Sequence, residues 1–319
     1  MISVVIPVYN EVESLTPLME RLLPAMAAIG EPYEVIFIDD GSSDGTARAL
    51  DNIGEKQRGL VKVIHFRTNM GKSAALQAGF DESAGELIVM MDGDLQDQPE
   101  EINKLLAALR EKNLDMVTGW KANRMDPISK TFPSKFFNRM LNRLSGLSIH
   151  DFNCGLKAFK RECLTSFTLY GQLHRFILVL AAHRGFKVGE VPVIHAPRLY
   201  GVSKYGVKRF YHGIMDILTV FFITRYLESP LYFFGIYGVT SMLVAVPIGA
   251  YFLIMHFLSF GWADPRWRLT EHPIWIVSPI LFLLGLIMIF FGLIGELITY
   301  HLISSGRSGP HQVKRPPAD

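Results

Sequence analysis

Two aspartates one residue apart, Asp92 and Asp94, are the strongest candidates in this sequence for chemistry with a metal ion. They directly follow the apolar run 87–91, and Gln96 and Asp97 come next. Because such a run is typical of a buried parallel strand, we expect both carboxylates at the carboxyl edge of the sheet, where ligands of open α/β sheets bind. Their hard oxygens suit Mg²⁺ or Mn²⁺ bridging two phosphates. An Asp-x-Asp tripeptide is common after strands, so this interpretation depends on its context.

The elements that must position this pair form a repeated strand and helix pattern. Runs typical of buried strands lie at 2–9, 34–38, 61–66 and 87–91, and helices are predicted after the first, through about residue 29, and after the third, at 73–84. This rhythm, about 25 to 30 residues per repeat, predicts an α/β fold with a doubly wound, mainly parallel sheet and helices on both faces. A Rossmann dinucleotide site is the main competitor. The first strand–helix turn, 7–11, lacks the G-x-G-x-x-G spacing, and the chain has no Walker lysine loop.

Four short motifs follow the ends of these strands. They read PVYNE at 7–11, DDGSSDGT at 39–46, NMGK at 69–72 and DGDLQD at 92–97. In this order they resemble the successive signatures of family 2 inverting glycosyltransferases with the GT-A fold. The resemblance implies a nucleotide diphosphosugar donor, held by nucleotide-binding residues Pro7, Tyr9, Glu11, Asp40 and Asp92. It also implies a Mg²⁺ or Mn²⁺ site formed by Asp92, Asp94 and Gln96, with Asp94 among the catalytic residues.

Gly71 and Lys72 open the helix predicted at 73–84. Backbone N–H groups at a helix N-terminus favour phosphate binding, and the lysine adds a positive charge. The alternative is an ordinary helix start with one exposed lysine, since no upstream glycine has the P-loop spacing. The sequence leaves both interpretations open.

The middle of the chain carries a basic amphipathic segment at 129–146. Lys135, Arg139 and Arg143 recur on one helical face, and apolar side chains occupy the other. One interpretation is a surface helix with snorkelling arginines. The other is a helix lying on anionic lipid, with arginines that reach headgroup or acceptor phosphates. The same helices could equally serve a homo-oligomer interface.

Three further motifs suggest the acceptor side of the site. The segment DFNCGLKAF at 151–159 resembles polyprenyl-phosphate glycosyltransferases, and we count Asp151 among the catalytic residues. Its carboxylate could act as a general base, but a phosphate acceptor is already anionic, so we favour positioning over proton removal. Residues 172–176, QLHRF, resemble the Q-x-x-R-W element of processive synthases, but Phe replaces Trp, and a purely structural role is the alternative. A basic loop follows the strand at 188–194 and resembles the family's loop over donor and acceptor phosphates. We assign Arg124 and Arg198 to catalysis. We expect the acceptor phosphate to be bound by Arg124, Ser134, Arg139, Arg198, Ser203 and Lys204.

The last third of the chain is apolar. Residues 229–263 and 272–295 contain no Asp, Glu, Lys or Arg, and each run exceeds the roughly 20 residues needed to cross a bilayer. We predict transmembrane helices at about 231–257 and 274–301. The predicted domains are therefore a cytoplasmic GT-A catalytic domain over 1–207, an interfacial helix over 208–228, two membrane helices within 229–303 and a disordered cytoplasmic tail over 304–319. Asp216 near the middle of 208–228 argues against a third span.

The distribution of basic residues predicts the topology. With two spans, both termini and the catalytic domain lie on one side, which carries Lys204, Lys208, Arg209, Arg225, Arg307, Lys314 and Arg315. The loop on the other side holds only Arg266 and Arg268. The positive-inside rule then places the catalytic domain and both termini in the cytoplasm of a multi-pass inner-membrane protein.

These features together predict an enzyme. The expected reaction is metal-dependent transfer of a hexose, glucose from UDP-glucose as first choice, to polyprenyl phosphate at the cytoplasmic membrane face, with inversion. GDP-mannose is an alternative donor, and a membrane glycan or lipid headgroup is an alternative acceptor. A non-enzymatic scaffold would not need its metal ligands, and all three are present. A net charge of +2 argues against bulk nucleic-acid binding.

Overall fold

The computed structural model describes residues 1–121, 128–164, 167–196, 208–227, 229–258 and 274–304. It divides into two compact units, Met1–Val220 and Phe221–Asp319. Four residues of the predicted site lie outside the described residues: Arg124, Arg198, Ser203 and Lys204. Residues 305–319 of the predicted tail lie outside them as well.

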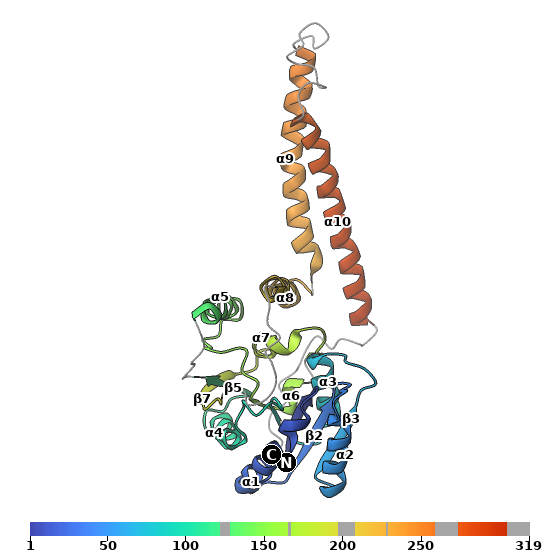
Figure 1. Ribbon diagram of the computed structural model, residues 1–319. Helices are drawn as coiled ribbons and strands as arrows, with labels where there is room; N and C mark the ends of the chain where they lie inside the picture. Colours follow the sequence, from blue (N-terminus) through green and yellow to red (C-terminus); the bar gives the residue numbers. More distant parts are fainter. Residues whose placement is uncertain (122–127, 165–166, 197–207, 228, 259–273, 305–319) are drawn as a thin grey trace. The chain divides into compact units, whose positions relative to one another are not determined.

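The first unit is built on a seven-stranded mixed sheet (Figure 1). The strands are β1 (Ile2–Val8), β2 (Tyr33–Asp39), β3 (Val61–His65), β4 (Leu87–Met90), β5 (Met116–Lys121), β6 (Lys157–Lys160) and β7 (Val188–Val193). Their order is β3-β2-β1-β4-β6-β5-β7, and β6 runs antiparallel to both of its neighbours while the other pairs are parallel. The prediction of a mainly parallel sheet is confirmed, but the strand β6 was not predicted from the sequence. With Lys157 and Lys160 at its ends, this four-residue strand has no apolar run to reveal it.

Helices cover both faces of the sheet. The helices of this unit are α1 (Val12–Ile29), α2 (Thr46–Lys56), α3 (Lys72–Glu82), α4 (Ile102–Glu111), α5 (Ile128–Ser145), α6 (Arg161–Leu164) and α7 (Ile177–His183), with 3₁₀ turns η1 (Pro99–Glu101) and η2 (Leu173–Phe176). Buried side chains of α1, α2 and α4 pack on the face that carries Val4 and Phe37. The helix α3 lies on the opposite face, where a Cβ at Gly79 would stand 2.6 Å from Ile38 Cδ1. The helix α8 (Lys208–Arg225) follows and crosses the boundary between the units.

This arrangement brings the ends of the central strands together. In parallel register Val5 of β1 pairs with Ile36 of β2 and with Met90 of β4, so the three strands finish side by side. The polar loops after β1, β2 and β4 therefore share one edge of the sheet, as the sequence predicts.

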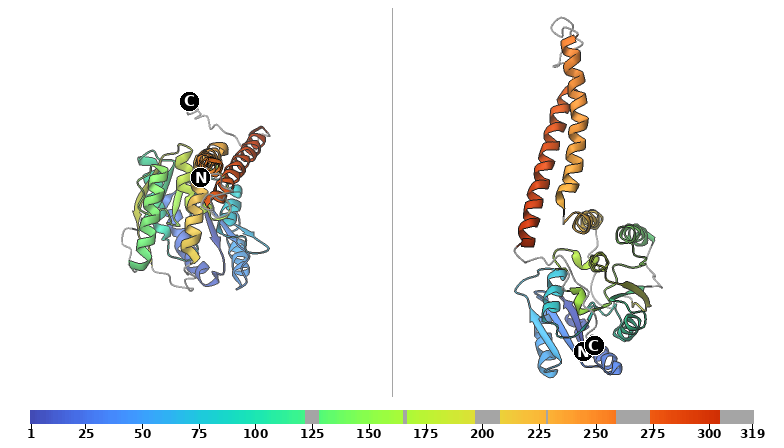
Figure 2. Two further views of the ribbon diagram at one scale, coloured as in Figure 1. Left: turned by 90° about the horizontal axis from the view of Figure 1, so that it is seen from above. Right: turned by 180° about the vertical axis from the view of Figure 1, so that it is seen from behind.

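The second unit is an antiparallel hairpin of two long helices, α9 (Pro230–Leu258) and α10 (Ile274–Ser304) (Figure 2). The helices approach closely at small residues, because a Cβ at Gly238 would lie 2.7 Å from the Gly285 carbonyl oxygen. Serine hydroxyls add hydrogen bonds across the hairpin, from Ser241 to Leu281 O (2.7 Å) and from Ser278 to Ala245 O (2.8 Å). Small residues with hydroxyl bonds are the usual basis of helix packing in membranes.

Both helices are long and apolar enough to cross a membrane. The segments that qualify, Pro230–Leu258 and Trp275–His301, have only 6% and 17% of their most apolar windows buried within the protein. Core helices of a soluble protein would be mostly buried, so this surface is apolar and exposed along its length. The acid that interrupts the second apolar run, Glu296, accepts the backbone N–H of Leu231 at 3.4 Å. It thereby satisfies a donor in the first turn of α9.

Candidate active site

The acidic loop that follows β4 lies at the carboxyl edge of the sheet. Asp94 and Asp97 are almost completely buried, and the Gln96 N–H donates to Asp94 Oδ1 at 3.2 Å. Leu95 between them adopts a left-handed backbone conformation with φ 63°, while its side chain is buried in the core. A buried non-glycine residue in this region is strained by about 1–3 kcal/mol, and such strain concentrates at functional sites. The loop that carries these carboxylates therefore has a strained backbone at Leu95.

Lys72, at the start of α3, forms an ion pair with Asp92. Desolvation alone would raise the pKa of Asp92, but the Lys72 ammonium, with Lys121 and Lys157 farther away, keeps the pKa below its usual value. The same pairing raises the pKa of Lys72 against the desolvation that lowers it. The Lys72 side chain is 32% exposed and pairs with a residue of the predicted metal site, and its contact with a phosphate stays a prediction.

Gly155 leaves space for these carboxylates. A Cβ at this position would lie 2.7 Å from Asp92 Cγ and would also meet Asp97 Oδ2. Two residues on, the completely buried Lys157 hydrogen bonds to the Cys154 carbonyl oxygen, and burial lowers its pKa although Asp151 and Asp92 act in the opposite direction. The strand β6, which the sequence did not predict, thus supplies a buried lysine, and the segment that leads into it supplies the gap.

The residues fit a hard divalent cation. Asp92 and Asp94 offer carboxylate oxygens, Asp92 stands against a gap that a side chain at 155 would fill, and Gln96, whose backbone N–H binds Asp94, carries an amide oxygen. Among the residues that the structure describes, no three His, Cys, Asp or Glu side chains converge as a metal site. Two carboxylates and an amide leave room for waters and phosphate oxygens, which is how Mg²⁺ is commonly held.

The loops after β1 and β2 form the neighbouring part of the edge. The Asp40 carboxylate accepts the N–H groups of Met70 (2.7 Å) and Gly71 (2.9 Å), so it orders the turn that leads into Lys72. Glu11 is fixed through its backbone, whose N–H donates to Thr46 Oγ1 at 2.9 Å. Tyr9 is 40% exposed at this edge. Tyr9, Glu11 and Asp40 of the predicted base pocket therefore come from adjacent loops, and Pro7 lies near the end of β1. Asp40 has a structural role, and its role in binding the base stays a prediction.

Asp151 is held by helix α5. Two asparagines one turn apart on this helix bind the backbone just before it: Asn138 Nδ2 donates to His150 O (2.6 Å) and Asn142 exchanges two hydrogen bonds with Ile149 (2.8 and 2.9 Å). Asp151 itself is 1% exposed, and its Oδ1 accepts the Asn153 N–H. Burial and fixed hydrogen bonding suit a positioning role.

The predicted acceptor residues are only partly visible. Arg139 lies exposed on α5. Ser134 falls within the same helix, but its side chain is outside the described part of the chain.

His195, which follows the edge strand β7, contacts the acidic loop that follows the central strand β4. It forms an isolated bridge with Asp97, and the Ala196 N–H donates to Gln96 O at 3.0 Å. The Lys121 Nζ lies 3.1 Å from His195 Nε2. Nothing in the local sequence marks this histidine, because its neighbours are brought to it only by the pairing of distant strands.

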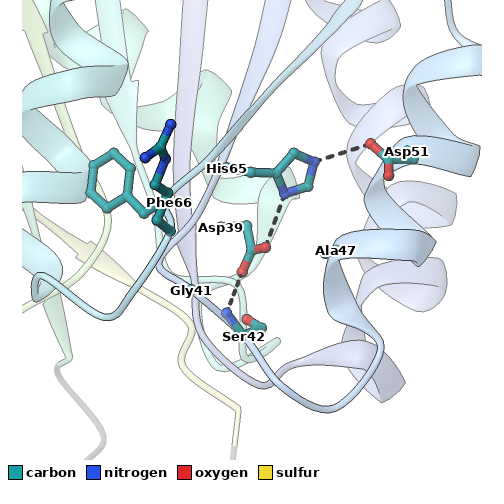
Figure 3. Close-up of a pocket in the computed structure, with 8 residues that line it drawn as sticks. Asp39, Gly41, Ser42, Ala47, Asp51, His65 and Phe66 are labelled. Atoms are coloured by element: carbon teal, nitrogen blue, oxygen red, sulfur yellow. Dashed lines mark hydrogen bonds and ion pairs between the residues drawn. The ribbon is translucent and has the colours of Figure 1, made fainter.

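A second cluster lies beside the predicted nucleotide site rather than in it. Figure 3 shows His65 between two aspartates: its Nδ1 lies 2.9 Å from Asp39 Oδ2, and its Nε2 lies 3.0 Å from Asp51 Oδ1. The Ser42 N–H donates to the other oxygen of Asp39. These residues line a small open pocket of about 220 Å³. Desolvation lowers the pKa of His65, but its two aspartate partners outweigh it and raise the pKa overall.

Comparison with known proteins identifies the family of this chain. Residues 3–167, more than half of the chain, match the sequence profile of Glycosyl transferase family 2. The chain belongs to this family. The resemblance drawn from the four motifs is therefore confirmed, and the protein is a glycosyltransferase.

Two relatives resemble nearly the whole of this family 2 glycosyltransferase. A dodecaprenyl-phosphate galacturonate synthase from Rhizobium johnstonii is 35% identical over 306 residues, which cover 94% of this chain and 88% of that protein. An undecaprenyl-phosphate 4-deoxy-4-formamido-L-arabinose transferase from Klebsiella pneumoniae is 35% identical over 298 residues, covering 93% and 88%.

Solved structures support the fold. Glucosyl-3-phosphoglycerate synthase from Mycobacterium tuberculosis, in complex with Mn²⁺, UDP-glucose and phosphoglyceric acid, superposes with a TM-score of 0.51 at 18% identity, over 70% of this chain and 79% of that one. At this identity the likeness concerns the fold alone. It confirms the predicted GT-A architecture of the catalytic unit of this glycosyltransferase.

Proposed function

We propose that this chain transfers one sugar from a nucleotide diphosphosugar to a polyprenyl phosphate, with inversion at the anomeric carbon. The observation that carries the proposal is the combination in one chain of the acidic loop at the sheet edge with two long helices of exposed apolar surface. The likeness to two transferases named for dodecaprenyl and undecaprenyl phosphate extends over more than nine tenths of the chain, so it includes both features.

The donor half uses the loops after β1, β2 and β4. Pro7, Tyr9, Glu11 and Asp40 bind the base, and Asp92, Asp94 and Gln96 hold Mg²⁺ or Mn²⁺. A bound cation neutralises negative charge on the diphosphate of the donor and of the leaving nucleotide. Lys72, already paired with Asp92, supplies a second positive charge at the same place.

The acceptor half uses residues that follow β5 and β7 in the sequence and residues of α5. Arg124, Ser134, Arg139, Arg198, Ser203 and Lys204 bind the acceptor phosphate. Its oxygen attacks the anomeric carbon in line as the bond to the donor diphosphate breaks. Because that oxygen is anionic, no strong general base is required, and Asp151 acts by positioning. Its burial and its fixed backbone support this assignment.

The membrane places the two substrates together. In this proposal α9 and α10 span the inner membrane, α5 and α8 lie at its cytoplasmic face, and both termini are cytoplasmic. The excess of Lys and Arg on that side supports the orientation. An acceptor with a long apolar chain stays in the bilayer while the soluble donor arrives from the cytoplasm.

The identity of the transferred sugar is the most specific part of the proposal. UDP-glucose is the donor predicted from the sequence, and GDP-mannose is its alternative. The relatives are named for galacturonate and 4-deoxy-4-formamido-L-arabinose, so nucleotide-linked forms of these sugars belong in the same test.

Transfer of radiolabel tests the proposal. Purified full-length protein in detergent receives Mn²⁺ or Mg²⁺, a short polyprenyl phosphate and each labelled donor in parallel. We expect label in the lipid phase that requires the metal and disappears in Asp94→Ala. The control Asp81→Ala, which removes only an exposed hydrogen bond to Gln77, keeps the activity. No lipid-phase label with any donor, from protein that still binds nucleotide, would reject the polyprenyl phosphate acceptor.

A further inference from the structure

The short 3₁₀ turn η2 lies between the donor edge and helix α8. Leu173 and Phe176 fix it in the core, and the Phe176 ring lies 5.8 Å from that of Phe137 on α5. The two residues between them, His174 and Arg175, point to different elements. This is the segment that resembles the Q-x-x-R-W element, and the proposed reaction gives it no role.

His174 contacts the first turn of α3. Its Nδ1 lies 2.9 Å from the Ser73 hydroxyl oxygen, which also accepts the His174 backbone N–H at 3.2 Å. Burial, and then the positive charge of Lys72, lower the pKa of His174 to about 3, so the ring is neutral at ordinary pH. Ser73 is 1% exposed and directly follows Lys72. The contact therefore fixes the backbone from which Lys72 reaches Asp92.

Arg175 contacts α8. Its Nη1 lies 3.5 Å from Asp216 Oδ2, and both side chains are mostly buried. On α8 the neighbouring Ile217 and Val220 are buried as well. A carboxylate in such apolar surroundings is unfavourable unless it is paired, and Arg175 is a positive partner within ion-pair distance.

These contacts form a continuous path from α8 to the donor carboxylate. We propose that Asp216, Arg175, His174 and Ser73 act as positioning residues that hold Lys72 against Asp92, so that nucleoside diphosphate binding depends on the seating of α8. The inference rests on the proposed function in one respect, that Asp92 belongs to the donor site. Since α8 is the last helix before the apolar hairpin in the sequence, the path makes donor affinity responsive to the helix that leads into the hairpin.

The first test measures nucleotide affinity directly. Titration calorimetry on the full-length protein in detergent uses UDP and GDP, each with Mn²⁺. We expect Asp216→Asn, Arg175→Gln and Ser73→Ala each to weaken binding at least about fivefold, the lower end of energetic coupling between sites. Thr219→Ala, an exposed change on α8, and Asp81→Asn, on the far end of α3, are matched controls that keep wild-type affinity.

Exchange of the two charges separates positioning from general damage to the fold. The single variants Arg175→Asp and Asp216→Arg should bind weakly, and the double variant should recover affinity to within about threefold, since the pair is restored in reverse. Arg175→Lys keeps the charge and should bind more tightly than Arg175→Gln. In the transfer reaction the donor KM should rise while the acceptor KM stays constant, a split that a partly unfolded enzyme would not produce.

Two results would overturn the proposal: folded Asp216→Asn and Arg175→Gln proteins with wild-type affinity, or a charge exchange that binds as weakly as its parents. Failure of the proposed function looks different. If the wild type transfers no sugar to polyprenyl phosphate yet binds a nucleotide with Mn²⁺, and the variants weaken that binding as expected, the positioning path stands and only the acceptor is wrong.

Discussion

Replacing Gly155 by alanine places a methyl group directly in the candidate metal site. The added Cβ would stand 2.7 Å from Asp92 Cγ and 2.8 Å from Asp92 Oδ2, and it would also meet Asp97 Oδ2. These separations are well inside van der Waals contact, so atoms must move. The backbone of 155 leads into β6, which is paired on both sides, and the carboxylates stand in a loop. We expect the carboxylates to give way.

The size of the effect follows from the cost of overpacking. Inserting a methyl group into a filled site typically costs about 1–3 kcal/mol. If that energy must be supplied to return Asp92 and Asp97 to their working positions, kcat/KM falls about 5- to 150-fold, at about 1.4 kcal/mol for each factor of ten. Displacement of reacting groups by about 1 Å gives losses of the same order.

The assay compares sugar transfer over a range of Mn²⁺ concentrations in wild type and Gly155→Ala. A displaced ligand set should also raise the Mn²⁺ concentration needed for half-maximal rate. Gly54→Ala is the matched control, because a Cβ at Gly54 of α2 meets only Val63 Cγ2, at 3.3 Å. Wild-type kcat/KM and metal dependence in a folded Gly155→Ala enzyme would refute the reasoning that this gap positions the carboxylates.

Three further predictions test separate parts of the structure. Asp94→Ala should lower metal-dependent transfer at least about 100-fold, and chelation by EDTA should reproduce that loss in wild type and be reversed by Mn²⁺; activity that survives both would exclude the assigned metal role. His65 has a raised folded-state pKa, so its ion pairs stabilise the protein fully below about pH 6.5 and less as pH rises through that raised pKa. His65→Gln should therefore lower the free energy of unfolding more at about pH 5.5 than at about pH 8.5, with a difference under about 1 kcal/mol because the ring is partly exposed, and equal losses at both pH values would contradict the assignment. Glu296→Leu removes the acceptor for the Leu231 N–H and should destabilise the hairpin by about 1 kcal/mol in detergent unfolding, whereas a more stable variant would show that the hydrogen bond contributes nothing.

Several features of this enzyme are determined by local sequence. The change from apolar residues to Asp92 places the acidic loop after a strand, and parallel register then carries it to the sheet edge. The two apolar runs predict the hairpin helices within a few residues of their observed bounds, since length and composition alone decide whether a helix can span a bilayer. The amphipathic segment at 129–146 likewise forms α5.

Other features arise only in the tertiary structure. Lys72 pairs with Asp92 because α3 packs against the sheet, and Gly155 reaches the same carboxylates through an antiparallel strand of four residues. Glu296 finds its partner across a helical hairpin. Periodicity and strand-end polarity report on neighbours a few residues apart. Contacts between segments 20 to 101 residues apart, such as those of Lys72 and of His174, depend on which elements pack together, and that is decided by the fold as a whole.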